Sequence, residues 1–321
     1  MRLLAEGART QEPTPRLVED LTPQISRESA LVLNFSAMEK QHPNHPGELS
    51  TDQSAAARQR THGELEARSE AIERLTEAGM PFMVGGAYAY GPYTGVYRDT
   101  KDLDLFVRKS DAVRCLQVLE KDGWLTERTY EVWLYKAFKA EWFIDLIFSS
   151  GNGIADVDDD WFKHAKPGVV FGHPVLLIPP EEMIWSKAFV LERERFDGAD
   201  VAHVFRSCAA TMDWNRLVRR FQRYWEVLLA HLLLFQFAYP CERSAIPEPV
   251  INLLLDQARQ SIRDGDWADR ICRGDLLSKV NYQLDIRNWG YSSGRSWDEA
   301  ERSGGGNGAR PEREDPRGSV G

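Results

Sequence analysis

The sequence predicts an α/β protein in which a mixed sheet with flanking helices is followed by an all-helical domain. Short apolar stretches of strand character alternate with amphipathic helical stretches up to about residue 178, and beyond that point the pattern is helical. The 321 residues, 42% of them hydrophobic, are enough for one large domain or two ordinary ones. We expect a flexible N-terminal extension (1–60), an α/β domain (61–178), a helical domain (179–292) and a disordered tail (293–321).

The first ordered element is a helix that begins near Thr61, because the apolar residues that follow recur on one helical face. Gly79 ends this helix. Residues 81–84 then form a short buried strand, and residues 103–107 form a second one. A stretch rich in tyrosine and glycine connects the two strands.

Another helix follows, with Ser110 placed to cap its start and Gly123 at its end. From residue 124 to residue 148, dense aromatic and β-branched residues with several alternations indicate further strands. Residues 175–178 add one more short strand. Helices interleaved with strands in this way are typical of a layered domain with helices packed against one sheet.

The helical half opens at residues 179–182, where proline and two acidic residues suit the first turn of a helix. A long helix is expected from about Asp213 to Ala238. Four arginines of this helix are spaced so that they share one face: Arg216, Arg219, Arg220 and Arg223. Such a stripe either is a solvated face paired to nearby acids or holds an RNA backbone or a nucleotide phosphate.

Charge and cysteine usage exclude several classes of protein. The net charge of -9 argues against a generic nucleic-acid coating protein, although a local basic patch is compatible with it. The four cysteines are far apart and none lies in a metal-type pair, which indicates free buried thiols in a reducing compartment. The N-terminus lacks the apolar stretch of a signal peptide, and the most hydrophobic run, residues 227–238, is too short to span a bilayer. We therefore expect a soluble, cytoplasmic protein with no membrane partner.

Three acidic residues stand out against apolar strands. Asp102 and Asp104 share one face of a strand, because residues i and i+2 of a strand point the same way. Asp145 is the only charge in the apolar strand 142–148. Such carboxylates are costly unless a cation lies between them, and their hard oxygen ligands suit Mg²⁺. Three acids on two strands can hold two metal ions, the arrangement that serves phosphoryl transfer.

Gly85 and Gly86 lie where a strand ends and a short helix begins. Glycines at such a point let backbone N–H groups approach a phosphate closely. Taken alone, a glycine pair is as often a plain turn, and an Asp-x-Asp sequence is common on exposed strand ends. Their order and spacing, together with the third acid, favour phosphate and metal chemistry over these structural roles.

The same residues resemble a known superfamily. The pattern consists of Gly85-Gly86 after an apolar residue, Arg-x-Thr-x-Asp-Leu-Asp at residues 98–104, and a lone Asp145 on a later strand. It resembles the DNA polymerase beta-like nucleotidyltransferase superfamily, which implies the nucleotidyltransferase fold for the α/β domain.

A second match lies downstream, where Lys187 is followed by Arg193-x-Arg195 and then by Asp197-x-x-Asp200. This is similar to the later element of AbiEii-type nucleotidyltransferases, which occur in bacterial toxin–antitoxin systems, and of their uncharacterised relatives. Phe196 stands where we expect that element to have a basic residue. Together the two matches cover about residues 80 to 205.

The resemblance implies a role for each matching residue. Asp102, Asp104 and Asp145 would bind Mg²⁺ and act in catalysis, with Asp145 also helping to deprotonate an acceptor hydroxyl. The nucleotide-binding residues would be Gly85, Gly86, Arg98, Thr100, Lys187 and Asp200. Within this set Lys187 would contact the triphosphate as a point charge.

We therefore expect a Mg²⁺-dependent nucleotidyltransferase that moves an NMP from an NTP to a hydroxyl acceptor and releases pyrophosphate. The acceptor is open among RNA, with a tRNA end in particular, a protein and a small molecule such as an aminoglycoside. The resemblance also makes an antitoxin protein a candidate partner. The alternative is a non-catalytic nucleotide-binding or protein-interaction module that retains the fold. Loss of one or more acids would mark such a module, and all three are present.

Overall fold

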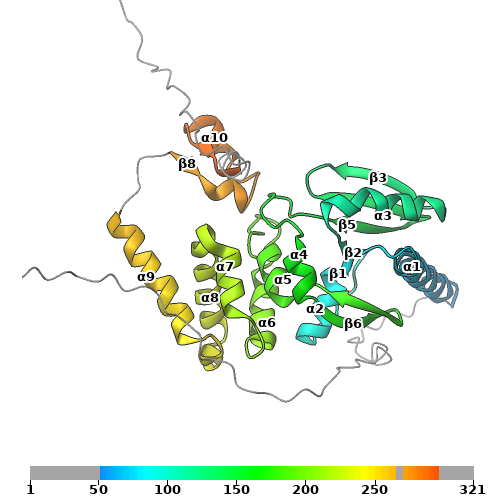
Figure 1. Ribbon diagram of the computed structural model, residues 1–321, viewed down its shortest axis with the longest axis horizontal. Helices are drawn as coiled ribbons and strands as arrows, with labels where there is room; N and C mark the ends of the chain where they lie inside the picture. The colour runs from blue at the N-terminus through cyan, green and yellow to red at the C-terminus, as the bar shows by residue number, and fades with distance from the viewer. Residues whose placement is uncertain (1–50, 265–269, 296–321) are drawn as a thin grey trace, which may run out of the picture. The chain divides into compact units, whose positions relative to one another are not determined.

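The main sheet is mixed and has seven strands (Figure 1). The structure is a computed structural model, and it describes residues 51–264 and 270–295. The strands of this sheet, in chain order, are β1 (Met83–Val84), β2 (Asp102–Phe106), β3 (Leu125–Tyr130), β4 (Leu134–Lys139), β5 (Trp142–Ile147), β6 (Lys166–Val170) and β7 (His173–Leu177). Their spatial order is β3-β4-β5-β2-β1-β7-β6. The pairs β2–β5 and β1–β7 are parallel, and the other neighbours are antiparallel.

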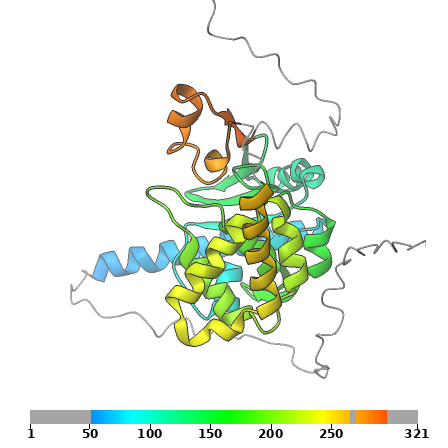
Figure 2. The ribbon, with the colours of Figure 1, turned by 90° about the vertical axis from the view of Figure 1, so that its left-hand side faces the viewer.

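Helices pack against this sheet and continue after it. In chain order they are α1 (Thr51–Glu77), α2 (Gly86–Thr94), α3 (Lys109–Lys121), α4 (Asp159–His164), α5 (Pro180–Lys187), α6 (Gly198–Cys208), α7 (Trp214–Phe221), α8 (Trp225–Ala238), α9 (Glu248–Asp264) and α10 (Gln283–Asn288). Short 3-10 helices are η2 (Gln222–Tyr224), η3 (Pro240–Ala245) and η4 (Arg273–Leu276). Helix α1 packs against α3 and the sheet, α2 packs against β2 and α6, and α7, α8 and α9 lie in succession (Figures 1 and 2).

The predicted fold class is confirmed. A mixed sheet with helices comes first and a helical region follows it. Within the described residues, that region is interrupted by the short parallel pair β8 (Ile271–Cys272) and β9 (Ser292–Ser293). One hydrophobic core extends from Ala67 on α1 to Leu276 and so continues across residue 178.

Several boundaries in the first half differ from the prediction. Helix α1 begins at Thr51 rather than near Thr61. Helix α3 begins at Lys109, and no side chain caps it, so the prediction that Ser110 is the cap is wrong. Strand β6, which contains Pro167, is not predicted by the sequence pattern. Proline is tolerated there because β6 is an edge strand, where one side of the backbone needs no partner.

The long helix predicted from about Asp213 to Ala238 is broken. It consists of α7, the turn η2 and α8, and Gln222 at the break has a φ of 33°. The turn brings Phe221 and Tyr224 against Trp185 of α5, with ring centroids 4.8 and 5.8 Å away. Aromatic packing against α5 therefore accompanies the interruption of the helix.

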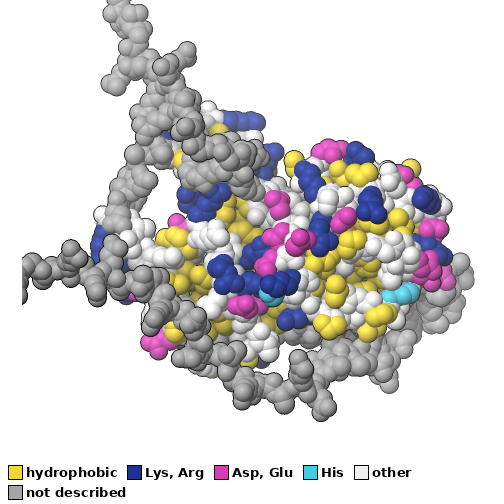
Figure 3. Space-filling view, viewed as in Figure 1, with side chains coloured by type: hydrophobic (Ala, Val, Ile, Leu, Met, Phe, Trp, Pro, Cys, Tyr) yellow, Lys and Arg dark blue, Asp and Glu magenta, His cyan; other side chains and the backbone are white. Residues whose placement is uncertain are grey.

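The predictions for the chain ends fall largely outside the described residues, which do not include 1–50 and 296–321. Ser293, which the prediction assigned to the disordered tail, lies in β9. All four cysteines have free thiols, and the expectation of burial is wrong only for Cys241, which is exposed. Every helix in the described part of the chain is too short or too polar to cross a membrane. On the face drawn in Figure 3, Lys and Arg side chains lie among Asp and Glu side chains.

Two arginines of the predicted stripe, Arg216 and Arg220, are paired to acids, as one of its two interpretations requires, but Arg216 is buried rather than solvated. Arg216 is only 3% exposed and pairs with Glu181 and Glu182 of α5. Arg220 bonds to Glu182 (Nε–Oε1, 2.9 Å) and to Asp158 (Nη1–Oδ2, 2.7 Å), and the side chain of Asp158 caps α4. This network ties α7 to α5 and, through Asp158, to the start of α4.

Arg216→Met is expected to lower the free energy of unfolding by about 3–5 kcal/mol, because it leaves the buried carboxylate of Glu181 without its cation and that of Glu182 with Arg220 alone. Urea unfolding measures the loss. Arg219→Met is the matched control, since Arg219 is exposed on the same helix and its loss is expected to cost less than about 0.5 kcal/mol. Equal losses in the two variants would contradict the importance of the buried network.

Candidate active site

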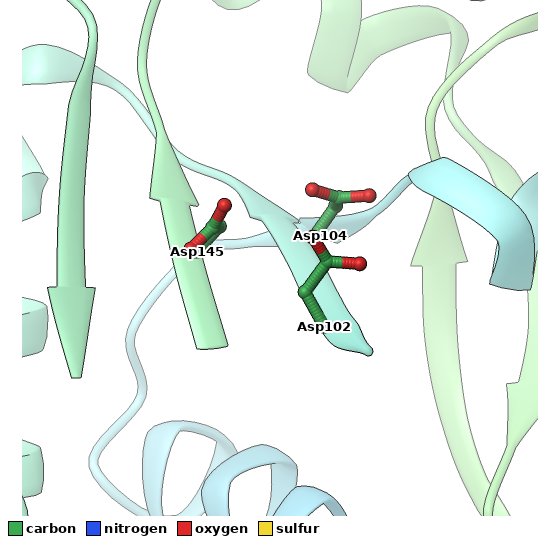
Figure 4. Close-up of side chains that lie close together, drawn as sticks. All are labelled: Asp102, Asp104 and Asp145. Atoms are coloured by element: carbon green, nitrogen blue, oxygen red, sulfur yellow. The ribbon is translucent and has the colours of Figure 1, made fainter. Parts of the chain in front are cut away.

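Three carboxylates lie together on one face of the main sheet. Asp102 and Asp104 project from β2, and Asp145 projects from the neighbouring parallel strand β5 (Figure 4). The register pairs Asp104 with Asp145, so the alternation of strand side chains puts all three on the same face. One carboxylate oxygen from each residue lies within 4.8 Å of the others. The intervening Leu103 and Ile144 are fully buried on the opposite face.

Two of these carboxylates have a hydrogen-bond donor. The hydroxyl of Thr100 donates to Asp102 (Oγ1–Oδ1, 2.6 Å). Lys136 stands opposite Asp145 on β4, and its ammonium group donates to that carboxylate (Nζ–Oδ1, 2.5 Å). Among the described residues, none donates a hydrogen bond to the carboxylate of Asp104. Asp104 therefore lacks the hydrogen-bond donor that each of its two neighbours has among the described residues.

The pKa values reflect this arrangement. Burial, and then the charges of Asp102 and Asp145, raise the pKa of Asp104 to about 7. Burial also raises the pKa of Asp145, although the hydrogen bond and charge of Lys136 act against it. A cation among the three groups would favour their ionised forms. Because hard carboxylate oxygens from several residues suit Mg²⁺, the donor set fits the metal that the sequence predicts.

Position 86 requires glycine for two reasons, the space available and the backbone conformation. Its φ is +52°, and a Cβ atom added to it would lie 1.8 Å from Oδ2 of Asp104. At Gly85, an added Cβ would lie 2.2 Å from the ring of Phe106, and the backbone N–H of Gly85 donates to the carbonyl oxygen of Asp104 (2.9 Å). The start of α2 therefore lies directly beside Asp104. The role of the two glycines as a phosphate cradle stays a prediction.

A second group of charges surrounds Lys187 at the end of α5. Its ammonium group bonds to Asp200 (Nζ–Oδ2, 2.8 Å) and Asp197 (Nζ–Oδ2, 3.1 Å). Arg98, from the loop before β2, also bonds to Asp200 (Nη2–Oδ2, 2.6 Å). Arg195 bonds to Asp197 through two nitrogens, at 3.0 and 2.8 Å. Lysine and arginine side chains thus converge on two aspartates from three segments of the chain.

Burial acts to raise the pKa values of Asp197 and Asp200, but their cationic partners lower them overall. Both residues are therefore ionised at neutral pH. The charge of Lys187 also acts to lower the pKa of Asp104, so the two charged groups lie within electrostatic reach of each other.

The structure brings the predicted site residues together in these two groups. One group holds the three acids with Gly85, Gly86 and Thr100, and the other holds Lys187, Arg98 and Asp200. Lys136 was not predicted, and Arg195 belongs to the matched downstream stretch but had no predicted role. The cation expected at position 196 is supplied by the preceding residue, Arg195, which bonds to Asp197. The ring of Phe196 stacks parallel to the ring of His231.

The fold and the three acids define the class of protein as nucleotidyltransferase-like. Residues 30–238 match a family model described as "Uncharacterised nucleotidyltransferase", and the chain belongs to that family. The predicted superfamily is thereby supported, whereas the AbiEii-type subgroup is not distinguished. A comparison with curated proteins found no match.

Solved structures with some likeness to the chain include three proteins. The antibiotic-resistance factor ANT(2'')-Ia is 16% identical, with 53% of this chain and 97% of that chain covered and a TM-score of 0.39. The lincosamide antibiotic adenylyltransferase LnuA, solved with lincomycin bound, is 14% identical, with 41% and 90% covered and a TM-score of 0.32. JHP933 from Helicobacter pylori is 10% identical, with 71% and 97% covered and a TM-score of 0.33. These TM-scores are too low to carry an inference about this chain.

Asp104→Asn is expected to stabilise the metal-free protein. The pKa of an ordinary Asp is 3.8, whereas the pKa of Asp104 is raised to about 7. Between these two pH values the native state therefore holds a proton that the unfolded state releases. The stability of the wild type therefore falls between about pH 4 and about pH 7 and stays at the lower level above that range. Melting temperatures in EDTA across this range measure the effect, and the advantage of the variant is expected to grow with pH. An advantage that does not change with pH would contradict the assignment.

Gly86→Ala is expected to weaken Mg²⁺ binding, because the new methyl group displaces the carboxylate of Asp104. Gly95→Ala is the matched control. Gly95 follows α2 at its other end, also has a positive φ (+73°), and has nothing within 4 Å of an added Cβ. Both variants carry the cost of a left-handed alanine, about 1–2 kcal/mol, but only the first disturbs the acids. Mg²⁺ titrations by calorimetry compare the two, and equal affinities would contradict the prediction.

Proposed function

We propose that the protein is a Mg²⁺-dependent nucleotidyltransferase that moves an NMP from an NTP to a hydroxyl group and releases pyrophosphate. The observation that carries the proposal is the group of three carboxylates within 4.8 Å, in a chain that belongs to a nucleotidyltransferase family. Three mutually repelling acids are costly to hold together on a sheet unless a cation lies among them, and the presence of all three favours metal-dependent transfer over a non-catalytic module that retains the fold.

Asp102, Asp104 and Asp145 are the residues that would hold the metal. Magnesium bound there supplies the positive charge that neutralises the triphosphate and the leaving pyrophosphate. In the transfer, the acceptor oxygen forms a bond to the α-phosphorus, and the bond from the α-phosphorus to the bridging oxygen breaks. The electron pair of that bond leaves with pyrophosphate. We assign the hydroxyl proton to the carboxylate of Asp145.

The second group of charges would bind the nucleotide. Lys187 and Arg98 are the cations that would contact the phosphates, and Asp200 holds both of them in place through its Oδ2 atom. Gly85 and Gly86 let the first backbone N–H groups of α2 approach a phosphate. This division of labour suits phosphoryl-type transfer, which needs positioning and charge neutralisation more than covalent chemistry.

The acceptor belongs to the proposal as well. We align the chain with the AbiEii-type enzymes, and the support is that Lys187 bonds to both Asp197 and Asp200, the residues that match the later element of that subgroup. This alignment favours an RNA acceptor, such as a tRNA end, and a cytoplasmic reaction with an antitoxin as a regulatory partner. A protein hydroxyl and a small molecule are the other acceptors that the test distinguishes.

The transfer assay uses each of the four α-³²P-labelled NTPs with Mg²⁺, total bacterial RNA and a protein lysate. The wild type is expected to label one acceptor class, and the Asp102→Asn/Asp104→Asn variant is expected to be at least about 10²-fold slower, because it lacks two carboxylates of the site. Asp99→Asn is the matched control, since Asp99 is an exposed acid of the segment just before β2. If the wild type showed neither transfer nor Mg²⁺-dependent NTP binding, the proposal would be overturned.

A further inference from the structure

A buried arginine on α1 reaches the loop that leads into the candidate site. Arg68 is only 3% exposed, although it carries a charge. Its guanidinium group pairs with Glu64 one turn earlier on α1 (Nη2–Oε1, 2.5 Å). It also donates to the hydroxyl of Tyr88 on α2 and to the backbone carbonyl oxygen of Thr100 (Nη2–O, 2.9 Å). One cation therefore connects α1, α2 and the segment just before β2.

Thr100 transmits this contact to the acids. It lies in the stretch 95–101 between α2 and β2, outside any helix or strand. The carbonyl group of Thr100 accepts from Arg68, while its hydroxyl donates to Oδ1 of Asp102 (2.6 Å). Holding the carbonyl group fixes the position of the residue and so the direction of its hydroxyl. The hydroxyl in turn selects one orientation of the Asp102 carboxylate.

The choice of arginine fits this task. A planar guanidinium group donates in several fixed directions at once, whereas a lysine ammonium is a point charge. Arg68 uses that geometry to contact Tyr88 and Thr100 together. Burying a cation is costly, and its Nε atom has no hydrogen-bond partner, so packing alone does not account for the residue. Asp102 lies within electrostatic reach of Tyr88, the partner of Arg68, since the charge of Asp102 contributes to the raised pKa of Tyr88.

We propose that Arg68 is a positioning residue that sets the orientation of the Asp102 carboxylate through Thr100. The inference rests on the proposed function, because it takes Asp102 as a metal ligand. It makes α1 a working part of the active site, and it assigns to Thr100 the orientation of an acid in place of direct contact with the nucleotide. Residues that orient metal ligands in this way typically change metal affinity by about 10–100-fold when they are altered.

The test measures Mn²⁺ binding to the full chain without nucleotide, from the electron paramagnetic resonance signal of free Mn²⁺. Arg68→Lys keeps the charge but loses the planar guanidinium group that donates in several directions. Thr100→Val keeps the shape of the side chain but loses its hydroxyl. Each is expected to weaken binding by about 10-fold. Thr100→Ser, which retains the hydroxyl, is expected to bind Mn²⁺ like the wild type. Arg74→Lys is the matched control, because Arg74 lies on the same helix and pairs with Glu77 instead.

The double variant Arg68→Lys/Thr100→Val decides whether the two residues act in series. If Arg68 acts through Thr100, the double variant binds Mn²⁺ as well as Thr100→Val alone. Losses that multiply would overturn the inference, and so would wild-type affinity in Arg68→Lys. Circular dichroism at the assay temperature verifies that each variant is folded. If the wild type itself binds no Mn²⁺, the metal site fails, and with it both the proposed function and this inference.

Discussion

The repulsion among three carboxylates is the constraint on which the rest of the site depends. Charges within 4.8 Å of one another repel by about 3 kcal/mol per pair at an effective dielectric constant of about 20. Two neighbouring residues each offset part of this repulsion: Lys136 donates a hydrogen bond to Asp145, and Thr100 donates one to Asp102. Asp104 lies between them with its pKa raised to about 7. The structure thus leaves most of the uncompensated charge at the place where a cation would bind.

The sheet is what keeps the acids from moving apart. Leu103 and Leu105 of β2 alternate with the acids on the other face, and they are fully buried, as is Ile144 of β5. A shift of either strand by one residue would move a carboxylate into this core and a leucine or isoleucine out of it. The apolar face therefore holds the parallel register that sets Asp104 beside Asp145. Burial on one face of the sheet maintains an unfavourable arrangement on the other.

Part of this site follows from the sequence and part does not. The period of two residues in a strand is enough to place Asp102 and Asp104 on one face, and the solitary charge of Asp145 marks its strand. Neither pattern shows that β2 and β5 are neighbours, because strand order is set by the packing of the whole domain. Lys136 was within reach of sequence reasoning. The two-residue turn that pairs Lys139 with Trp142 also pairs Lys136 with Asp145 by counting back along the hairpin.

Other features have no local signal. Arg68 is linked to the site through a backbone carbonyl group more than 30 residues away, and any residue type offers such a group. The break between α7 and α8 packs against Trp185 of α5, a contact that the helical periodicity of the segment does not reveal. Contacts to the backbone and packing between distant elements are thus what the sequence alone leaves out. The acids themselves are visible because an ionised side chain in an apolar strand conflicts with its surroundings.

The two charged groups also bear on how the candidate site would accept the anionic nucleotide that we propose, despite its acids. Five carboxylates belong to it (Asp102, Asp104, Asp145, Asp197 and Asp200), and four cations accompany them (Lys136, Lys187, Arg98 and Arg195). The balance is slightly negative without metal, so the protein alone offers little attraction to a triphosphate. Divalent cations at the three acids would reverse that sign, and the nucleotide would then meet a positive site. Lys187 and Arg98 are held beside this region by aspartates, which keeps their ammonium and guanidinium groups oriented before any phosphate arrives.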